Sequence, residues 1–339
     1  MLSAINKINF FNKKSSKLAF IVFIIFTIIA IFINFIANDK PLIAKCKNKY
    51  YFPIFKIYPE TEFGGYLETE ADYLDVDVQK YINNHGWIIW PLIKFSYKTI
   101  NYNLGEDFPS PPTSENIFGT DDHGRDVFAQ IFYGYRISLL FSLLMTIIVL
   151  FIGILMGLLQ GYLGGYTDIL LQRFTEIWLS MPFFFIIIAI SYIAKPGFFI
   201  LLLIISFTSW AKVANMMRFD VLRIRNMDYV LFARALGVSN FKIIIRHILP
   251  NALGSVVSYT PFLIAEGLIK LTALDFIGFG LSFNMPSLGV VLEQARGNMS
   301  APWIAISIFT ILSYILIMLI FIGNDLRFSS KSKPSSKKK

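Results

Sequence analysis

The sequence predicts an all-α polytopic membrane protein, and three observations support this fold class. Its 339 residues are 55% hydrophobic and only 16% charged, whereas soluble domains carry about a quarter charged residues. The mean hydropathy is +0.59. Several apolar runs have the ~20 residues that cross the hydrocarbon core of a bilayer. The net charge of +9 then indicates Lys and Arg gathered on the cytoplasmic side of a membrane rather than binding to nucleic acid.

The first predicted span covers residues 18–37 and follows a basic N-terminus of residues 1–17. A cleaved signal peptide is the alternative for this run. The run is too long for a signal peptide, and no small-x-small cleavage site follows it. We therefore expect a retained first transmembrane helix, in which Asn34 is the most polar residue.

Five further spans are predicted in a transmembrane domain of residues 138–322, although Pro182, Pro261 and Glu266 interrupt some of them. A tight turn is expected at Lys195-Pro196-Gly197, between the third and fourth spans. The five expected spans are residues 138–160, 177–194, 198–216, 253–274 and 303–322.

Basic residues flanking the spans predict the orientation of the chain. Lys and Arg are concentrated in the N-terminus, in residues 212–247 and in the tail of residues 323–339. Six spans place both termini on one side, and the charges predict that this side is the cytoplasm. Residues 38–137 then form a small periplasmic region of loops and strands. An independent enzyme domain is the alternative there, but no catalytic constellation appears. Cys46, the only cysteine, is expected to be unpaired.

A basic segment, residues 228–250, lies between the fourth and fifth predicted spans. Asn226 or Asp228 can cap a short helix that begins near Tyr229. Gly237 suits the left-handed position at which helices commonly end. The pattern predicts a short helix followed by a sharp turn.

A second short helix is expected after this turn, because Ser239 can cap it. Pro250 cannot continue the helical hydrogen bonds, which favours a break before the fifth span. Two short helices at an angle would form a compact knob that fits a groove in a partner protein. An amphipathic loop on anionic lipid is the other interpretation, since such loops also favour Arg. Composition alone leaves both open.

A polar motif, Phe-Gly-Thr-Asp-Asp-His-Gly-Arg-Asp-Val, occupies residues 118–127 before the second span. Its oxygen-bearing side chains fit a Ca²⁺ or Mg²⁺ site loosely. Because an arginine interrupts the acidic cluster, the pattern favours a structural turn that sets the entry angle of the second span. The metal interpretation rests on Asp121, Asp122, His123 and Asp126. The expected structural residues are Gly119, Asp121, Gly124, Arg125 and Asp126.

Glycines recur at every fourth position in the second span, at Gly153, Gly157 and Gly161. Small residues at this spacing let helices approach closely in lipid. Because the spacing repeats, a packing face is favoured over incidental glycines. The charged residues that follow are expected on a solvated, ion-paired face: Asp168, Arg173 and Glu176.

Glu266 and Lys270 lie four residues apart in the fifth span, so they share one helical face and can form an ion pair. Ionisable groups inside a membrane are costly and usually face a cavity or a partner. We predict that both residues lie near the transport pathway. A structural ion pair, or a span shifted so that both residues lie near the interface, is the alternative.

The segment of residues 228–250 resembles the coupling loop of ABC-importer permeases, here about residues 217–252. That loop carries a Gly and, thirteen residues later, a Pro. One departure stands out, because Leu231-Phe232 replaces the Glu-Ala of the family. The matching stretches are Tyr229-Val230, Ala233-Arg234-Ala235-Leu236-Gly237-Val238-Ser239 and Arg246-His247-Ile248-Leu249-Pro250-Asn251. The resemblance implies that the ATPase-coupling residues are Tyr229, Ala233, Ala235, Gly237, Ser239, Leu249 and Pro250.

Other motifs resemble the second permease type of the peptide importers, over about residues 118–327. These are the motif of residues 118–127 and the stretch of residues 271–280, Leu-Thr-Ala-Leu-Asp-Phe-Ile-Gly-Phe-Gly. Outer motifs, including Asn38-Asp39-Lys40-Pro41 and Pro109-Ser110-Pro111-Pro112, resemble the subtype that takes up microcin C and related oligopeptides. The resemblance implies the type I importer permease fold with six transmembrane helices.

The resemblance implies a permease subunit that moves peptides across the bacterial inner membrane. Its expected partners are a second permease, ABC ATPase subunits, a periplasmic peptide-binding protein and the lipid bilayer. No Gly-x-x-x-x-Gly-Lys-Ser/Thr loop occurs, so ATP and Mg²⁺ are expected on the ATPase and no cofactor is expected on this chain. A gradient-driven secondary transporter or channel is the rival, but no inverted repeat is visible. A membrane-bound enzyme lacks a nucleophile–base or metal set.

Overall fold

The computed structural model describes residues 14–102, 108–193, 197–281 and 285–331. The chain divides into two compact units. The described part of the first, here called the helical unit, comprises residues 14–23, 138–193, 197–281 and 313–331. The second, called the mixed unit, comprises residues 24–137 and 285–312, apart from the undescribed stretch. Three helices (α2, α5 and α13) contribute residues to both units.

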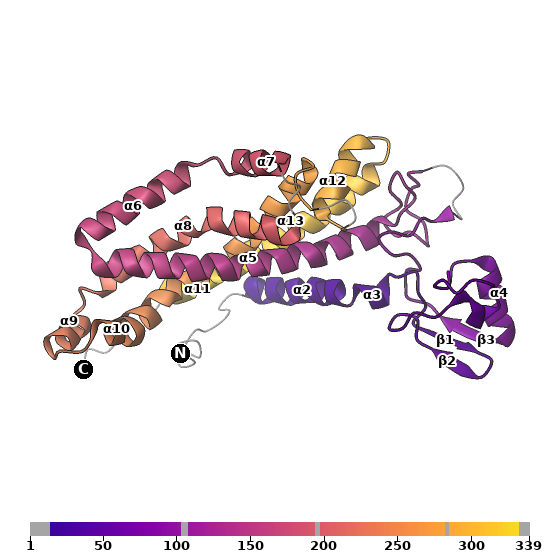
Figure 1. The fold of residues 1–339 in the computed structure, drawn as a ribbon, viewed down its shortest axis with the longest axis horizontal. Helices are drawn as coiled ribbons and strands as arrows, with labels where there is room; N and C mark the ends of the chain where they lie inside the picture. The colour runs from indigo at the N-terminus through magenta and orange to yellow at the C-terminus, as the bar shows by residue number, and fades with distance from the viewer. Residues whose placement is uncertain (1–13, 103–107, 194–196, 282–284, 332–339) are drawn as a thin grey trace. The chain divides into compact units, whose positions relative to one another are not determined.

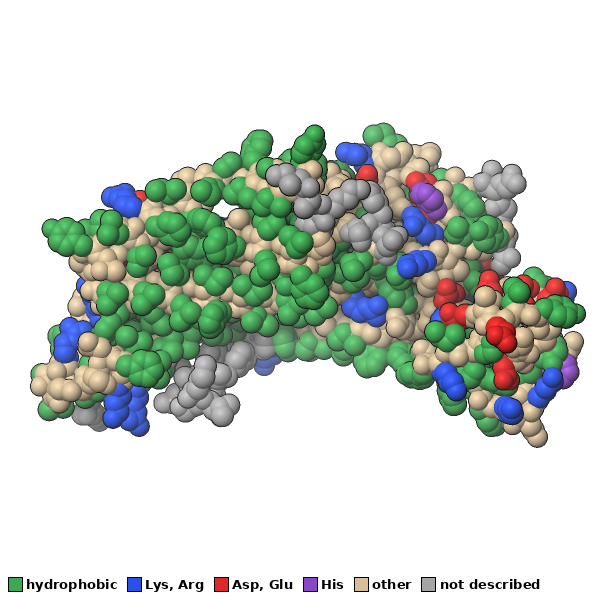
Figure 2. Space-filling model, in the orientation of Figure 1, with side chains coloured by type: hydrophobic (Ala, Val, Ile, Leu, Met, Phe, Trp, Pro, Cys, Tyr) green, Lys and Arg blue, Asp and Glu red, His purple; other side chains and the backbone are tan. Residues whose placement is uncertain are grey.

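Long apolar helices dominate the described chain (Figure 1). Five of them have the length and hydropathy to cross a membrane, which agrees with the expected polytopic class. Hydrophobic side chains cover most of their visible face (Figure 2). The five are α2 (Lys14–Ile31), α5 (Val127–Leu163), α8 (Phe198–Ile224), the run from α10 (Asn240–Ile243) to α11 (Leu249–Phe276), and α13 (Pro302–Lys331).

The third predicted span, residues 177–194, is not one straight helix. Helix α6 (Gly165–Ser180) ends before Pro182, and α7 (Phe183–Ile193) begins after it at an angle of 69°. Pro182 has no N–H to donate and disfavours helical geometry in the residue before it. The described residues therefore contain six candidate spans only if this bent pair is counted as one.

The first span agrees with its prediction, with one short interruption. Helix α2 is followed at Phe32 by α3 (Ile33–Ile36), and the N–H of Ala37 donates to the Ile33 carbonyl. Asn34, the polar residue in this run, accepts a hydrogen bond from Nη1 of Arg136 at 3.1 Å. The polar side chain of Asn34 thus has a hydrogen-bond partner within the mixed unit, although it lies in an apolar helix.

The glycine spacing of α5 is a packing face, as predicted. An added Cβ at Gly153 would lie 2.6 Å from the Val213 side chain, and one at Gly157 would lie 2.5 Å from the Ala214 carbonyl oxygen. Gly161 is equally close to Val221. All three contacts are on α8, so the glycines allow the backbones of α5 and α8 to approach closely.

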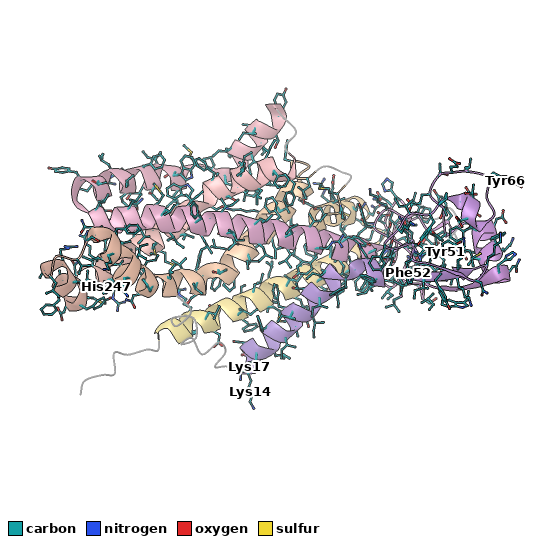
Figure 3. All side chains as sticks on the ribbon, turned by 60° about the horizontal axis from the view of Figure 1, so that its bottom comes forward. Lys14, Lys17, Tyr51, Phe52, Tyr66 and His247 are labelled. Atoms are coloured by element: carbon teal, nitrogen blue, oxygen red, sulfur yellow. The ribbon has the colours of Figure 1, made fainter. Side chains whose placement is uncertain are left out.

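The mixed unit contains a small antiparallel sheet in the order β2-β1-β3, formed by β1 (Ile43–Cys46), β2 (Lys49–Tyr51) and β3 (Gly86–Ile89). The predicted loops and strands are confirmed, and two short helices were not predicted: the 3₁₀ turn η1 (Glu60–Phe63) and α4 (Val76–His85). Buried aromatic rings, including Tyr51, fill the space beneath the sheet, whereas Phe52 and Tyr66 are exposed (Figure 3). Cys46 is buried and unpaired.

A later part of the mixed unit, helix α12 (Leu288–Gly297), packs against the start of α5, close to the motif of residues 118–127. Helix α12 begins at Ser287, whose hydroxyl accepts a hydrogen bond from the Gly289 N–H. Gly134 of α5 lies against this start, because an added Cβ would be 2.9 Å from the Leu288 nitrogen. The close approach brings the beginning of α5 and α12 together and positions the polar turn between them.

Candidate functional site

The segment between α8 and α11 begins with a short helix, α9 (Asp228–Ala235), which ends at Gly237 as predicted. Gly237 has φ +73°, in the left-handed region that glycine adopts without strain. Its N–H donates to the Arg234 carbonyl at 3.0 Å, and the Val238 N–H donates to the Ala233 carbonyl at 3.1 Å. These two bonds form a Schellman motif, which satisfies carbonyls at the end of α9.

The predicted cap at the start of α9 is wrong. Met227 occupies the N-cap position without a side-chain hydrogen bond, Asp228 is the first helical residue, and the Asn226 side chain donates back to the Leu222 carbonyl. An acidic residue in the first turn still favours the helix through its macrodipole. Asp228 therefore acts on α9 through its charge rather than as the cap.

The second short helix, α10, has Ser239 at its N-cap position as predicted, although no side-chain cap hydrogen bond forms. The predicted break at Pro250 is wrong. A π-helical turn, η3 (Ile244–Ile248), joins α10 to α11 without interruption. Pro250 lies in the first turn of α11, where a missing N–H costs little.

The surface of this segment is apolar as well as basic. Leu231 and Phe232, which depart from the family motif, are exposed, whereas Val230 and Ala233 are buried. Tyr229 accepts a hydrogen bond from Asn251 at 3.3 Å, and its ring lies beside His247 (Figure 3). The large exposed apolar side chains of the segment are Tyr229, Leu231, Phe232, Leu236, Phe241 and Ile245.

The remaining predicted coupling residues lie around the same two turns. Ala235 is exposed in the last turn of α9, while Leu249 and Pro250 are half-buried at the start of α11. Short helices held at a fixed turn with an apolar outer surface are compatible with a protein groove, and an apolar and basic surface also suits anionic lipid. The coupling role of these residues stays a prediction.

The polar motif of residues 118–127 forms the structural turn that was predicted. The carboxylate of Asp121 is fully buried. Its Oδ1 accepts the backbone N–H groups of His123 and Arg125, at 2.9 and 2.8 Å. Its Oδ2 accepts Nε of Arg125 at 2.7 Å, Nε2 of Gln130 at 2.7 Å and Nε2 of Gln294 at 3.1 Å. One carboxylate thus connects the turn to α5 and α12.

Asp126 is the second buried anchor of this turn. It accepts the Ala129 N–H at 2.7 Å, at the start of α5, and the Asn116 side-chain amide at 2.8 Å. Burial raises the pKa of Asp126 to about 6, although these hydrogen bonds act in the opposite direction. The turn also requires glycine at two positions, since Gly119 and Gly124 have φ +73° and +74°.

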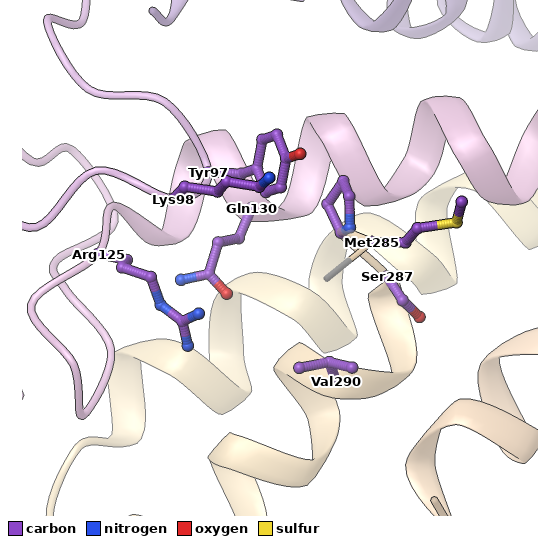
Figure 4. A pocket seen from close by; sticks show the side chains of 8 residues that line it. Tyr97, Lys98, Arg125, Gln130, Met285, Ser287 and Val290 are labelled. Atoms are coloured by element: carbon purple, nitrogen blue, oxygen red, sulfur yellow. The ribbon is translucent and has the colours of Figure 1, made fainter. Parts of the chain in front are cut away.

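Three groups of the motif lie close enough to hold a cation: Asp121, Asp122 and His123. The structure favours the structural interpretation, because the Asp121 oxygens already accept five hydrogen bonds and Arg125 is one of the donors. Beside the turn lies a cavity of about 270 Å³ with positive charge from Lys98 and Arg125 (Figure 4). Its lining residues are Tyr97, Lys98, Arg125, Gln130, Met285, Pro286, Ser287 and Val290.

The predicted pair of Glu266 and Lys270 is present, with 2.7 Å between Oε1 and Nζ. Two residues that the sequence did not associate with this pair join it from α8. Nζ of Lys212 lies 3.1 Å from the same Glu266 oxygen, and Lys270 donates to the Ser209 hydroxyl at 2.7 Å. Lys212 was predicted as part of the basic region 212–247, but its place inside an apolar span was the signal for a different role.

Asp168 departs from its prediction. Arg173 and Glu176 form the expected exposed pair at 2.7 Å. Asp168 instead is largely buried and pairs with Arg218 of α8, with Nε to Oδ1 at 2.6 Å and Nη2 to Oδ2 at 2.7 Å. The physical reason is that α6 packs beside α8, so its first turn faces protein rather than solvent.

Comparison with known proteins assigns this architecture. Residues 150–324 match the family described as binding-protein-dependent transport system inner membrane component. The chain is 41% identical over 292 residues to the inner membrane ABC transporter permease protein YejE of Escherichia coli, covering 86% of each chain. It is 40% identical over 317 residues to the peptidoglycan transport system permease protein YejE of Agrobacterium fabrum, covering 86% of this chain and 83% of the relative.

A more distant relative belongs to the same group. The oligopeptide transport system permease protein OppC of Haemophilus influenzae is 34% identical over 236 residues, covering 69% of this chain and 75% of the relative. These relatives are transport permeases rather than enzymes, and they support the importer interpretation over the secondary transporter. The chain therefore belongs to the binding-protein-dependent inner membrane components, the multi-pass permease subunits of ABC importers.

Proposed function

We propose that this chain is one of two permease subunits of an importer that uses ATP hydrolysis on partner ATPases to move peptides inward. The observation that carries this proposal is the knob of α9 and α10, a basic segment with exposed apolar side chains between two spanning helices. A permease with no nucleotide-binding loop of its own needs such a surface to receive work from another subunit. ATP and Mg²⁺ are bound by that subunit, and this chain carries no cofactor.

The coupling step follows from helical geometry. The knob continues through η3 into α11 with no loop between them. When ATP closes the ATPase pair, movement of the knob shifts α11 relative to its neighbours and biases the spans between inward- and outward-facing states. ATP can shift this equilibrium only through contacts that differ between the two states. The exposed side chains Phe232, Leu236 and Phe241 supply such contacts.

The orientation is part of the proposal. The knob, the basic N-terminus and the basic tail are cytoplasmic, following the distribution of Lys and Arg. The mixed unit's sheet and polar turn are then periplasmic, where a peptide-binding protein delivers its cargo.

The cargo class rests on the relatives. OppC proteins are described as oligopeptide permeases, and the Agrobacterium fabrum relative is described as a peptidoglycan permease. The outer motifs that resemble the microcin C subtype also favour peptides. Peptides, including those released from peptidoglycan, are therefore the proposed cargo.

Reconstitution of the intact importer in liposomes tests the proposal. This chain, its second permease, its ATPases and its binding protein should accumulate labelled oligopeptides when ATP is supplied to the ATPase side. A parallel assay with peptidoglycan-derived peptides distinguishes the two cargo groups. Accumulation driven by an ion gradient without ATP would support the secondary transporter instead.

A further inference from the structure

Lys212 lies in a spanning helix and is not buried. It is the fifteenth of the 27 residues of α8, and its side chain is 52% exposed. The predicted apolar span of this helix ends at residue 216, so Lys212 lies about one turn inside it. A charged side chain within a span is costly against lipid, and such residues usually face a water-filled cavity or a partner.

The face of α8 around Lys212 carries two further polar residues and one large apolar residue. Thr208 and Asn215 lie four residues before and three residues after Lys212 on this side, and the exposed Phe219 lies seven residues after it. The Thr208 hydroxyl donates to the Ile205 carbonyl at 2.9 Å, and Asn215 Oδ1 is buried without a hydrogen-bond partner among the described residues. The opposite side of α8 presents the exposed apolar side chains of Leu203 and Phe207. The exposed charge of Lys212, rather than a polar stripe along the helix, therefore indicates an aqueous path at this point of α8.

Charge around this face does not balance. Lys212 and Lys270 both contact one oxygen of Glu266, so two ammonium groups share a single carboxylate and leave one surplus positive charge. Lys270 is the better satisfied of the two, since it also donates to Ser209 and lies 4.6 Å from the Phe183 ring centroid. The surplus charge therefore belongs to Lys212, the more exposed lysine.

We propose that Lys212 binds the carboxylate of a peptide as the peptide crosses the membrane. This inference rests on the proposed peptide-import function and extends it to cargo with a free C-terminus. A C-terminal carboxylate is ionised at neutral pH and supplies the negative charge that the cluster lacks. Glu266 contacts both lysines, although they lie on different helices, and this contact restrains the side chain of Lys212.

A carboxylate from the second permease subunit has the same chemistry and is the other source. The two sources differ in what they control. A cargo carboxylate affects which peptides are transported, whereas a partner carboxylate affects assembly of the two permeases. Lys212→Gln addresses both, because it leaves the Glu266–Lys270 pair neutral and so avoids an unpaired buried charge.

The experiment measures ATP-driven uptake by the reconstituted importer, using one peptide sequence with either a free C-terminus or a C-terminal amide. Preference is the ratio of the two uptake rates. Because every variant uses the same binding protein, that protein's own preference cancels when variants are compared. The variants are Lys212→Gln, the charge-preserving Lys212→Arg, and Lys56→Gln as a matched control at an exposed lysine of the mixed unit.

Lys212→Gln should reduce the preference for the free acid by about tenfold, because loss of one charge-assisted hydrogen bond weakens binding by roughly this factor. Lys212→Arg and Lys56→Gln should retain the wild-type preference. An equal loss for both peptides, together with loss of the second permease on co-purification, would overturn the inference in favour of a subunit contact. An unchanged preference with full uptake would also overturn it. Failure of the wild-type importer to transport any peptide would instead refute the proposed function itself.

Discussion

Arg218 on α8 holds Asp168 on α6 through two parallel hydrogen bonds, Nε to Oδ1 at 2.6 Å and Nη2 to Oδ2 at 2.7 Å. Both side chains are more than four-fifths buried, at 17% and 13% exposed. Bidentate pairing of this kind fixes geometry as well as charge. The pair ties the first half of the bent α6–α7 segment to a continuous spanning helix.

Asp168→Asn should therefore lower the apparent free energy of unfolding by about 2–4 kcal/mol, because it leaves the Arg218 charge without its partner. Thermal unfolding of the purified protein in detergent measures the change. Glu176→Gln is the matched control, since it breaks an ion pair on the same helix whose side chains are 73% and 45% exposed. That control should cost less than about 0.5 kcal/mol. Equal effects of the two changes would contradict the anchoring role of Asp168.

Gly237→Val should uncouple ATP hydrolysis from transport. A β-branched residue at φ +73° is strained by at least about 1–2 kcal/mol, which disrupts the Schellman turn between α9 and α10. The spans should still insert, and the measured loss should be in peptide uptake and in cargo-stimulated ATPase activity. Gly254→Val is the control, because an added Cβ there also meets open space but the backbone is helical. Normal uptake by Gly237→Val would count against the turn's role.

Asp126→Asn should weaken the outer turn, because the Asn116 amide that donates to the carboxylate would then face another amide. We expect a loss of about 1–3 kcal/mol and a lower yield of folded protein. Since the turn is structural, added Ca²⁺ or a chelator should not alter the difference from wild type. Rescue by Ca²⁺ would favour the metal interpretation.

The same carboxylate predicts a dependence on pH. Its pKa of about 6 in the folded state lies above the ordinary value of 3.8, so the folded protein retains this proton through that window. The unfolding free energy should thus fall as pH rises from about 4 to about 6 and level off above it, a change on the order of 2–3 kcal/mol. Thermal unfolding of wild type and Asp126→Asn across this range isolates the contribution, which the Asn variant should lack. A wild-type profile that rises through the window would have the wrong sign.

Glu266→Gln should damage the protein more than the double change Glu266→Gln with Lys270→Met. The single change leaves Lys212 and Lys270 as two neighbouring cations without their shared carboxylate. Removing one partner of a buried pair costs about 3–5 kcal/mol, and removing both costs less. Yield and thermal unfolding of the complex report the order. Equal, negligible effects would show that this face is in contact with bulk water.

Cysteine labelling tests the orientation. In a Cys46→Ser background, Asn48→Cys in the sheet turn should react with a membrane-impermeant thiol reagent on intact spheroplasts. Asn226→Cys, in the turn between α8 and α9, should react only after permeabilisation. Both positions are exposed, so access depends on the side of the membrane. Labelling of Asn226→Cys in intact spheroplasts would invert the proposed topology.

Sequence reasoning predicted the features whose cause is local. Gly237, Gly119 and Gly124 all occupy the left-handed region, because a sharp turn between apolar or polar runs requires it. The glycine spacing on α5 and the pairing of Glu266 with Lys270 also follow from helical periodicity alone. Each of these depends on residues within a few positions of one another.

Features that depend on a distant helix were missed. The sequence predicts a solvated Asp168, because its partner Arg218 is fifty residues away on another helix. The contact between Lys212 and Glu266 likewise depends on the packing of α8 on α11. Pro250 was misjudged for a different reason. A proline breaks a helix in its interior but is tolerated in the first turn, and nothing local shows that a π turn lies just before it.

That π turn has a rotational consequence. A π-helical turn accommodates one residue more than an α-helical turn, so the residues beyond η3 are rotated by about 100° relative to an uninterrupted α-helix. The direction in which α11 presents Glu266 relative to the knob is therefore set by this one extra residue, in a turn that ends eighteen residues before Glu266. Deleting a residue from η3 would shorten the helix by only about 1.5 Å, yet it would rotate the knob by about 100° relative to the charged face of α11. The π turn thus fixes the rotational relationship between the knob and the charged face of α11, in addition to the distance between them.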